Sequence, residues 1–219
     1  MVSIVNYGAK CDGLTDCAPA INDALKEESV IFIPQGRWLI GNEILIPSHR
    51  KIKADEKAVI FCMDDKFTGQ NMRAAVTNSD YENGNEDITV EGGVWDGNNA
   101  RNPRKDGWRS GPCQGLLFSF FNVKNLTLKN MTVKNSESYH FRLGKAVDFI
   151  ISDIIMSDDL FTPCQDGIHV GGGSANGVIK NIIAPRGSTN DDLIAFNADD
   201  ANWYCHNRGM KDAPIKNML

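Results

Sequence analysis

Short apolar strand patterns recur along most of this chain, and their spacing limits the possible folds more than any other feature. In one series, the central apolar residues Phe118, Phe141, Ile168 and Ile194 lie about 23 to 27 residues apart. A second series of alternating segments runs between them, at residues 87–94, 124–131, 147–154, 176–182 and 211–218. Strands repeating at intervals of roughly 20 to 50 residues are typical of solenoids, in which each repeat packs on its neighbours.

The repeats predict an all-β fold, a parallel β-helix. Helical periodicity is missing between the repeated segments, so helical and leucine-rich repeats fit poorly. In a β-helix, equivalent residues of neighbouring coils stack about 4.8 Å apart. Asn130, Asp153, Asn181 and Asn217 are therefore expected to form one column at a corner, because Asn and Asp tolerate left-handed backbone and hydrogen-bond turns.

The first residues predict a cap for one end of this solenoid. Thr15 and Asp16 precede apolar residues at helical spacing from Ala18 to Leu25, so either can cap an α-helix there. We expect a single domain over 1–219, with the cap and first strands at 1–60 and the repetitive coils at 86–219. The last coil looks incomplete, which predicts either a truncated or cleaved chain or a partner that covers the open edge, and end-to-end self-association at this edge is one such contact.

The composition limits the classes of partner that the protein is expected to bind. The net charge is −5 without a Lys/Arg run, which argues against nucleic acid. No apolar run approaches the roughly 18 residues of a membrane helix, and no signal peptide is visible, so we expect a cytoplasmic protein or a secreted one whose signal was removed. The six cysteines form no CxxC pair, so we expect no metal and no cofactor, and mostly buried, reduced thiols. Cys11 and Cys17 could pair in a secreted protein.

Two motifs place carboxylates at the same edge of consecutive strands. CQDGIHV at 164–170 and NDDLIAF at 190–196 lie one coil apart, so Asp166 should lie beside Asp192, with Asp191 one residue along and stacked on Gln165. Strict alternation would send Asp166 inward, where an unpaired carboxylate is costly. We therefore expect the strand to begin at Gly167 or later, with Asp166 on a bend facing solvent.

The same alternation predicts the floor of a cleft. With the apolar series inward, the outward row is Ser119, Arg142, His169 and Ala195, and His140 lies on the side of Arg142. Arg142 and His169 could bind an acidic or hydroxyl-rich sugar, and His140 and Gln165 complete the predicted substrate-binding set. Alternatively, these are ordinary surface residues and the aspartates serve turns. The acidic pairs Asp158–Asp159 and Asp199–Asp200 are expected to be solvated or turn-forming.

The N-terminal pattern NYGAKCDGLTDCAPAINDAL…VIFIPQGRWLI resembles the start of pectate-lyase-like, right-handed β-helix proteins. CQDGIHV and NDDLIAF resemble the two aspartate motifs of the polygalacturonases, glycoside hydrolase family 28, usually written NTDGIDI and GDDCIAI. Cys164-Gln165 stands in place of Asn-Thr, and Asn190 in place of Gly. The later His-Gly and Arg-Ile-Lys motifs of the family are absent.

This resemblance implies an inverting hydrolase of pectin-like polysaccharide. Asp191 would be the general acid, and Asp166 and Asp192 would activate the attacking water. Two alternatives remain open: a non-catalytic carbohydrate-binding β-helix of the adhesin or tail-spike kind, and a polysaccharide lyase or epimerase on the same scaffold. A calcium-dependent lyase could use the acidic pairs as ligands.

Overall fold

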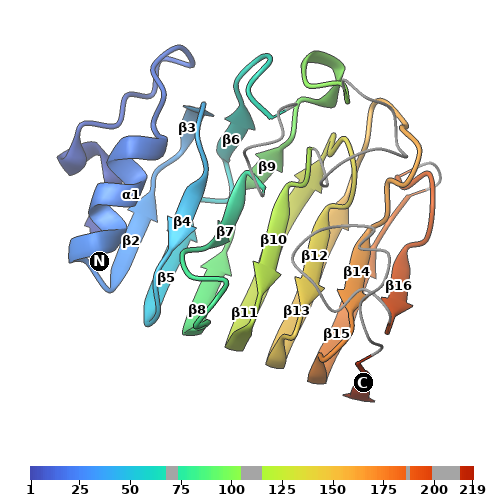
Figure 1. Cartoon of the computed structure of the whole chain (residues 1–219). Helices are drawn as coiled ribbons and strands as arrows, with labels where there is room; N and C mark the ends of the chain where they lie inside the picture. Colours follow the sequence, from blue (N-terminus) through green and yellow to red (C-terminus); the bar gives the residue numbers. More distant parts are fainter. Residues whose placement is uncertain (68–73, 105–114, 186–187, 199–212) are drawn as a thin grey trace.

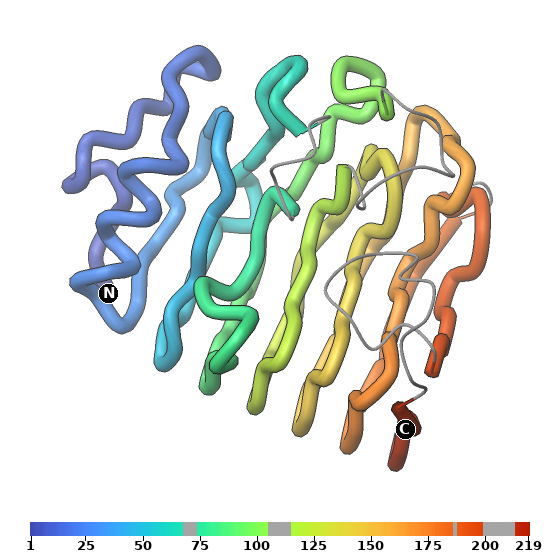
Figure 2. Tube along the Cα trace, viewed as in Figure 1, coloured from blue at the N-terminus to red at the C-terminus, as the bar shows by residue number. Residues whose placement is uncertain are grey.

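The computed structural model describes residues 1–67, 74–104, 115–185, 188–198 and 213–219. All paired strands within them are parallel, and they form two sheets that run from the N-terminal to the C-terminal end of the molecule (Figure 1). Successive coils follow one another in sequence order, as the colour gradient of Figure 2 shows. The chain is therefore the parallel β-helix that the repeats predict.

Among the described residues, the larger sheet has eleven strands, and eight of them form its main ladder in the order β1-β2-β5-β8-β11-β13-β15-β17. The ladder strands are β1 (Val2–Ser3), β2 (Val30–Ile33), β5 (Arg50–Ala54), β8 (Asn85–Glu91), β11 (Val123–Lys134), β13 (Val147–Met156), β15 (Ala175–Ile183) and β17 (Lys216–Met218). Beside it, β3 (Gly36–Ile40), β6 (Ala58–Cys62) and β9 (Val94–Asp96) pair in turn, and β9 joins β11. Strands before residue 86 thus belong to the same ladder as those after it.

The smaller sheet carries the apolar series that the sequence singled out. Its order is β16-β14-β12-β10-β7-β4. The strands are β4 (Ile44–Ile46), β7 (Val76–Asn78), β10 (Phe118–Phe121), β12 (Phe141–Gly144), β14 (Ile168–Gly171) and β16 (Ile194–Asn197). Phe118 pairs with Phe141, Phe141 with Ile168, and Ile168 with Ile194, so the predicted register is confirmed.

The core is a stack of equivalent side chains from these coils. The rings of Phe118 and Phe141 stack with centroids 5.1 Å apart, and Trp95 meets Phe118 edge-on at 5.2 Å. These three residues and Ile168 are fully buried. Ile194 and Phe196 on β16 are 37% and 48% exposed, because β16 pairs only with β14 among the described strands.

The predicted helix covers the N-terminal end of the core. Helix α1 spans Ala18–Glu27 and packs against β4 and β2 at the blue end of Figure 1. Its buried face is Ala18, Ile21, Ala24 and Leu25. Asp16 accepts a hydrogen bond from the Ala18 amide at 3.0 Å and also binds the Gly41 amide, which joins the helix start to the coil behind it. Two short 3-10 helices, η1 (Ile4–Tyr7) and η2 (Asn99–Arg101), complete the described elements.

Residues with left-handed backbone form columns along the corners. Asn130, Asp153 and Asn181 have φ between 54° and 59° and lie in one column, where the Asn181 amide donates to Asp153 at 2.8 Å. Asn217 does not belong to it, which corrects the prediction. Its amide donates to Asn176 at 2.9 Å, in the neighbouring column. The reason is that an apolar–Lys–Asn–apolar pattern occurs at both corners, at 128–131 and 179–182 in one column and at 123–126 and 215–218 in the other, so sequence likeness alone does not distinguish them.

That neighbouring column contains His49, Asp87, Asn125, Asp148, Asn176 and Asn217, all with positive φ. Hydrogen bonds connect its members, including Asn125 to Asp87 at 2.6 Å and Asn176 to Asp148 at 2.9 Å. The bond from Asn125 lowers the pKa of Asp87, helped by His49. The column is therefore a structural ladder that holds successive turns in place.

The cysteines in the described residues are free thiols. Cys17 and Cys62 are buried, Cys164 is partly buried and Cys11 is exposed, so Cys11 and Cys17 are not paired. Cys113 and Cys205 lie outside the described residues. Within the part of the chain that the structure describes, no helix is long and apolar enough to cross a membrane.

Candidate active site

The structure brings the aspartates of the two motifs to the same edge of the smaller sheet. Asp166 lies two residues before β14, and Asp192 lies two residues before β16. The Gly167 amide donates to the Asp192 carbonyl at 2.9 Å, and the Ile168 amide donates to the Leu193 carbonyl at 2.9 Å. The parallel ladder thus continues outward past both strands, so Asp166 and Asp192 occupy equivalent places in neighbouring coils.

Asp166 differs from its prediction in one respect. As expected, the strand begins only at Ile168, after a bend at Gly167. The Asp166 side chain, however, is only 8% exposed instead of facing solvent. Its Oδ2 lies 2.9 Å from Nδ1 of His169, so the carboxylate is turned over the outer face of β14 and finds a polar partner there. Asp191 and Asp192 are exposed.

The residues predicted to form the cleft floor do align in one row, but other side chains cover them. Ser119, Arg142, His169 and Ala195 align in register, as predicted. All four are buried, which contradicts the expectation of an open floor. Part of the cover comes from two tyrosines. The Tyr81 hydroxyl lies 3.1 Å from Ser119 Oγ, and the Tyr139 ring stacks on the His169 ring with centroids 4.3 Å apart and an interplanar angle of 2°.

His140 and Asp158 form a buried pair behind Asp166. His140 directly precedes β12, and its Nε2 lies 2.9 Å from Oδ2 of Asp158. Neither side chain is exposed. The prediction of a solvated Asp158 is therefore wrong, because the carboxylate turns inward to His140 and accepts the Asn135 amide. Asp159 does face solvent, where it pairs with Lys134 at 2.8 Å. Asp199 and Asp200 lie outside the described residues.

Gln165 is placed under Asp191 but points into the protein. The Asn190 amide donates to the Gln165 carbonyl at 3.3 Å, in keeping with the predicted stacking of Asp191 on Gln165. The side-chain amide donates to the Ser136 carbonyl at 2.7 Å, and its oxygen accepts the Thr162 amide at 3.3 Å. Gln165 is fully buried, so these contacts support the loop on which the aspartates lie.

A buried ion pair near this edge, between Arg104 and Glu137, was not foreseen. The Arg104 guanidinium lies 3.2 Å from Oε1 of Glu137 and also binds the Glu137 carbonyl at 2.6 Å. Burial raises the pKa of Glu137, and Arg104 opposes part of that rise. Neither residue has a motif that marks it in the sequence. Charge and loop position alone would not have revealed that Glu137 is buried.

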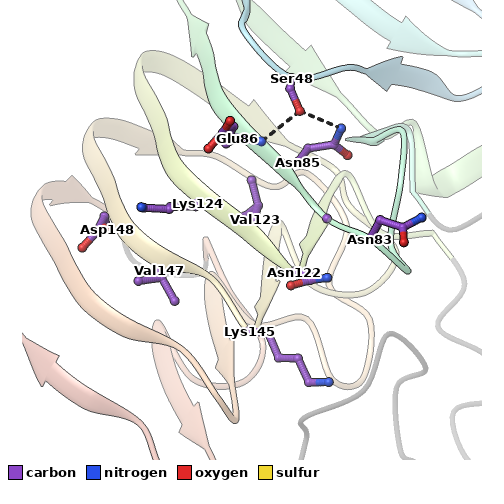
Figure 3. Close-up of a pocket in the computed structure, with 11 residues that line it drawn as sticks. Ser48, Asn83, Asn85, Glu86, Asn122, Val123, Lys124, Lys145, Val147 and Asp148 are labelled. Carbon is purple, nitrogen blue, oxygen red and sulfur yellow. Dashed lines mark hydrogen bonds between the residues drawn. The ribbon is translucent and has the colours of Figure 1, made fainter.

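The structure also shows a pocket of about 580 Å³ at the opposite end of the strands (Figure 3). Asn122 and Lys145 directly follow β10 and β12 and line it, whereas the aspartates precede their strands. Its carboxamides are used within the fold, since Asn85 donates to Ser48 at 3.2 Å and Asn122 to the Glu82 carbonyl at 3.1 Å. This pocket is therefore separate from the carboxylate edge.

One group of potential metal ligands stands out among the described residues. Ligand atoms of His49, Glu86 and Asp87 lie within 4.8 Å of one another, and all three residues are exposed. His49 and Asp87 belong to the corner column, where their 2.8 Å contact joins neighbouring turns. This arrangement has a structural explanation and lies away from the aspartate motifs.

The model of glycosyl hydrolases family 28 matches residues 34–209, which is most of the chain. The chain belongs to this family. Polygalacturonase from Persea americana is 25% identical over 210 residues, covering 89% of this family 28 chain and 43% of the relative. The chain thus spans less than half the length of that relative.

Solved structures agree on the fold. An exopolygalacturonase of Yersinia enterocolitica matches with a TM-score of 0.78 at 17% identity, over 100% of this family 28 chain and 48% of the other. PfbA, a surface adhesin of Streptococcus pneumoniae, matches with a TM-score of 0.70 at 18% identity, over 90% of this chain and 56% of the other. The fold is a right-handed parallel β-helix, as predicted.

Proposed function

We propose that this protein hydrolyses glycosidic bonds in a pectin-like or other acidic polysaccharide, with inversion at the anomeric carbon. The observation that carries the proposal is the register of the two motifs. The Gly167–Asp192 hydrogen bond of 2.9 Å sets Asp166 beside Asp191 and Asp192 in a chain of family 28. The name of the polygalacturonase relative supports the substrate class.

The aspartates divide the chemistry between them. An inverting hydrolase needs one carboxylic acid that protonates the leaving oxygen and one carboxylate that activates water. Asp191 is exposed and is the general acid, where an incoming polymer can reach it. Asp192 and Asp166 are the carboxylates that activate water, and the contact with His169 holds Asp166 in one orientation. His169 and Arg142 were predicted to bind substrate, but both are buried, so the proposal assigns them no direct contact with substrate.

Single replacements test these roles. Asp166→Asn, Asp191→Asn and Asp192→Asn should each lower kcat on oligogalacturonides by about 10²–10⁴-fold, the usual contribution of general acid–base groups. Asp148→Asn makes the same chemical change at an exposed corner and should keep wild-type activity. Proton NMR of the first product should show the inverted anomer. Unchanged turnover in all three aspartate variants would refute the proposal.

A second function is a saccharide-binding β-helix without turnover. One feature favours it: the Asp166 carboxylate is nearly buried against His169, which restricts its access to a water on the substrate. The structural likeness to the adhesin PfbA is compatible with it. This candidate predicts that isothermal titration detects binding of acidic oligosaccharides while prolonged incubation releases no new reducing ends. Detectable hydrolysis by the purified chain would exclude it.

A further inference from the structure

The backbone carbonyl of Asp166 receives two hydrogen bonds from one residue. The His140 backbone amide lies 3.0 Å from this oxygen, and the ring Nδ1 of His140 also lies 3.0 Å from it. A carbonyl oxygen only accepts hydrogen bonds, so Nδ1 must carry a hydrogen. His140 is fully buried, and the direction of the Asp166 carbonyl is therefore set by His140.

Asp158 in turn fixes the ring of His140. Its two carboxylate oxygens lie 3.1 and 2.9 Å from Nε2 of His140, and its side chain has no exposed surface. The Asn135 amide donates to the same carboxylate and anchors it. Because Nδ1–H donates to the Asp166 carbonyl, the contact between Nε2 and the Asp158 carboxylate requires a second hydrogen, which these two groups share. A carboxylate placed in this way holds the histidine ring in one orientation.

The peptide between Asp166 and Gly167 passes this constraint to the next coil. Its carbonyl accepts from His140 on one side, and its N–H donates to the Asp192 carbonyl at 2.9 Å on the other. A peptide unit is planar, so fixing the carbonyl also fixes the N–H. The contacts therefore form one chain from Asp158 through His140 and this peptide to Asp192.

We propose that Asp158 and His140 form a positioning pair that orients the Asp166–Gly167 peptide and so sets the relation of Asp166 to Asp192. Both side chains are buried, so they act through this peptide without touching substrate, and His140 is a positioning residue instead of the substrate-binding residue that the sequence suggested. The expected effect of this pair on turnover rests on the proposed function. Its expected effect on the orientation of the Asp166–Gly167 peptide does not depend on that function.

The first experiment measures the peptide directly. Amide exchange at Gly167, followed by NMR, should be at least about tenfold faster in Asp158→Asn than in the wild type, because local opening of this hydrogen bond becomes easier. Asp159→Asn is the matched control. It makes the same replacement at the adjacent, exposed residue, whose contacts are to Lys134 and Asn135, and it should leave the exchange rate unchanged. Equal exchange in the two variants would overturn the inference.

The second experiment measures turnover. Asp158→Asn should lower kcat by about 10²-fold, the size expected when reacting groups are misplaced by about 1 Å, and should change KM by less than about twofold. Asp159→Asn should retain both constants. If replacing the three aspartates does not reduce activity, the proposed function fails, and the exchange experiment still decides the positioning pair. If activity needs the aspartates but Asp158→Asn keeps its kcat, the positioning pair is wrong.

A third experiment uses only the wild-type protein, so its result does not depend on whether a variant folds. In nitrogen-15 spectra of the histidine rings, Nδ1 of His140 should carry a hydrogen in the folded protein. An unprotonated Nδ1 would break the chain of contacts at its first link and overturn the inference, whatever the variants do.

Discussion

Gly167 leaves no space for a side chain between two coils. A Cβ at this position would lie 2.4 Å from the Leu193 carbonyl oxygen and 2.8 Å from Sδ of Met156. Ordinary contacts begin at 3.4 Å, so the Leu193 backbone would have to move by about 1 Å. We predict that Gly167→Ala pushes β16 away from β14 and carries Asp192 with it, because the Gly167 amide holds the Asp192 carbonyl.

Both the stability and the activity of Gly167→Ala follow from this displacement. Overpacking costs about 1–3 kcal/mol, and each kcal/mol lowers Tm by about 2–4 °C in a chain of this length. A shift of about 1 Å between reacting groups lowers kcat by about 10²-fold. Differential scanning calorimetry and a reducing-end assay on oligogalacturonides measure the two effects.

Gly177→Ala is the control that separates stability from position. Its Cβ would lie 2.2 Å from Cζ of Phe149, so it overpacks the core to a similar degree. Gly177 lies on β15 of the larger sheet, away from the aspartates. It should lower Tm similarly and leave kcat within about threefold of the wild type. If both variants lose stability equally and both keep kcat, the register of the two motifs does not control activity. An unchanged Tm in Gly167→Ala would refute the steric reasoning itself.

Three further predictions concern stability. Asp158→Ala should cost about 3–5 kcal/mol in urea unfolding because it removes the partner of a buried group, whereas Asp23→Ala, at an exposed pair, should cost under about 1 kcal/mol; equal losses would contradict this. Burial raises the pKa of Glu137, so its contribution to stability should be full below pH 4.5, the unfolded value, and should be lost as the pH rises through the folded value. Glu137→Gln should lack that loss of stability. If the wild type and Glu137→Gln showed the same pH dependence of stability, Glu137 would not be the responsible group. Asn125→Ala should cost about 1–2 kcal/mol because φ is 56°, and Asn125→Gly should cost less; the reverse order would argue against backbone strain.

The sequence was sufficient for the stacking of strands. Phe118, Phe141, Ile168 and Ile194 pair as their spacing predicts, and Asp166 and Asp192 follow in the same register. The physical reason is the geometry of a parallel ladder. Equivalent residues of successive coils must lie side by side, so one correctly aligned apolar position places its neighbours along the strand.

The sequence was insufficient for residues whose environment depends on other coils. Asn217 was assigned to the wrong corner because two corners share one pattern, and hydrogen bonding to Asn176 decides between them. Asp166 was expected to face solvent because a buried, unpaired carboxylate is costly. His169 supplies the partner that makes its burial acceptable.

Alternation and spacing therefore determined the solenoid, its helical cap and the meeting of the two aspartate motifs, since these depend on periodicity within the chain. Only the tertiary structure decided which polar side chains are buried and what they bind. Asp158 and Asp159 are adjacent in the sequence, yet one pairs with His140 inside the protein and the other with Lys134 at the surface. Both contact the segment 134–140 of the neighbouring coil, but the Asp158 side chain turns inward and the Asp159 side chain turns outward, and the order of residues in a single strand carries no record of that difference.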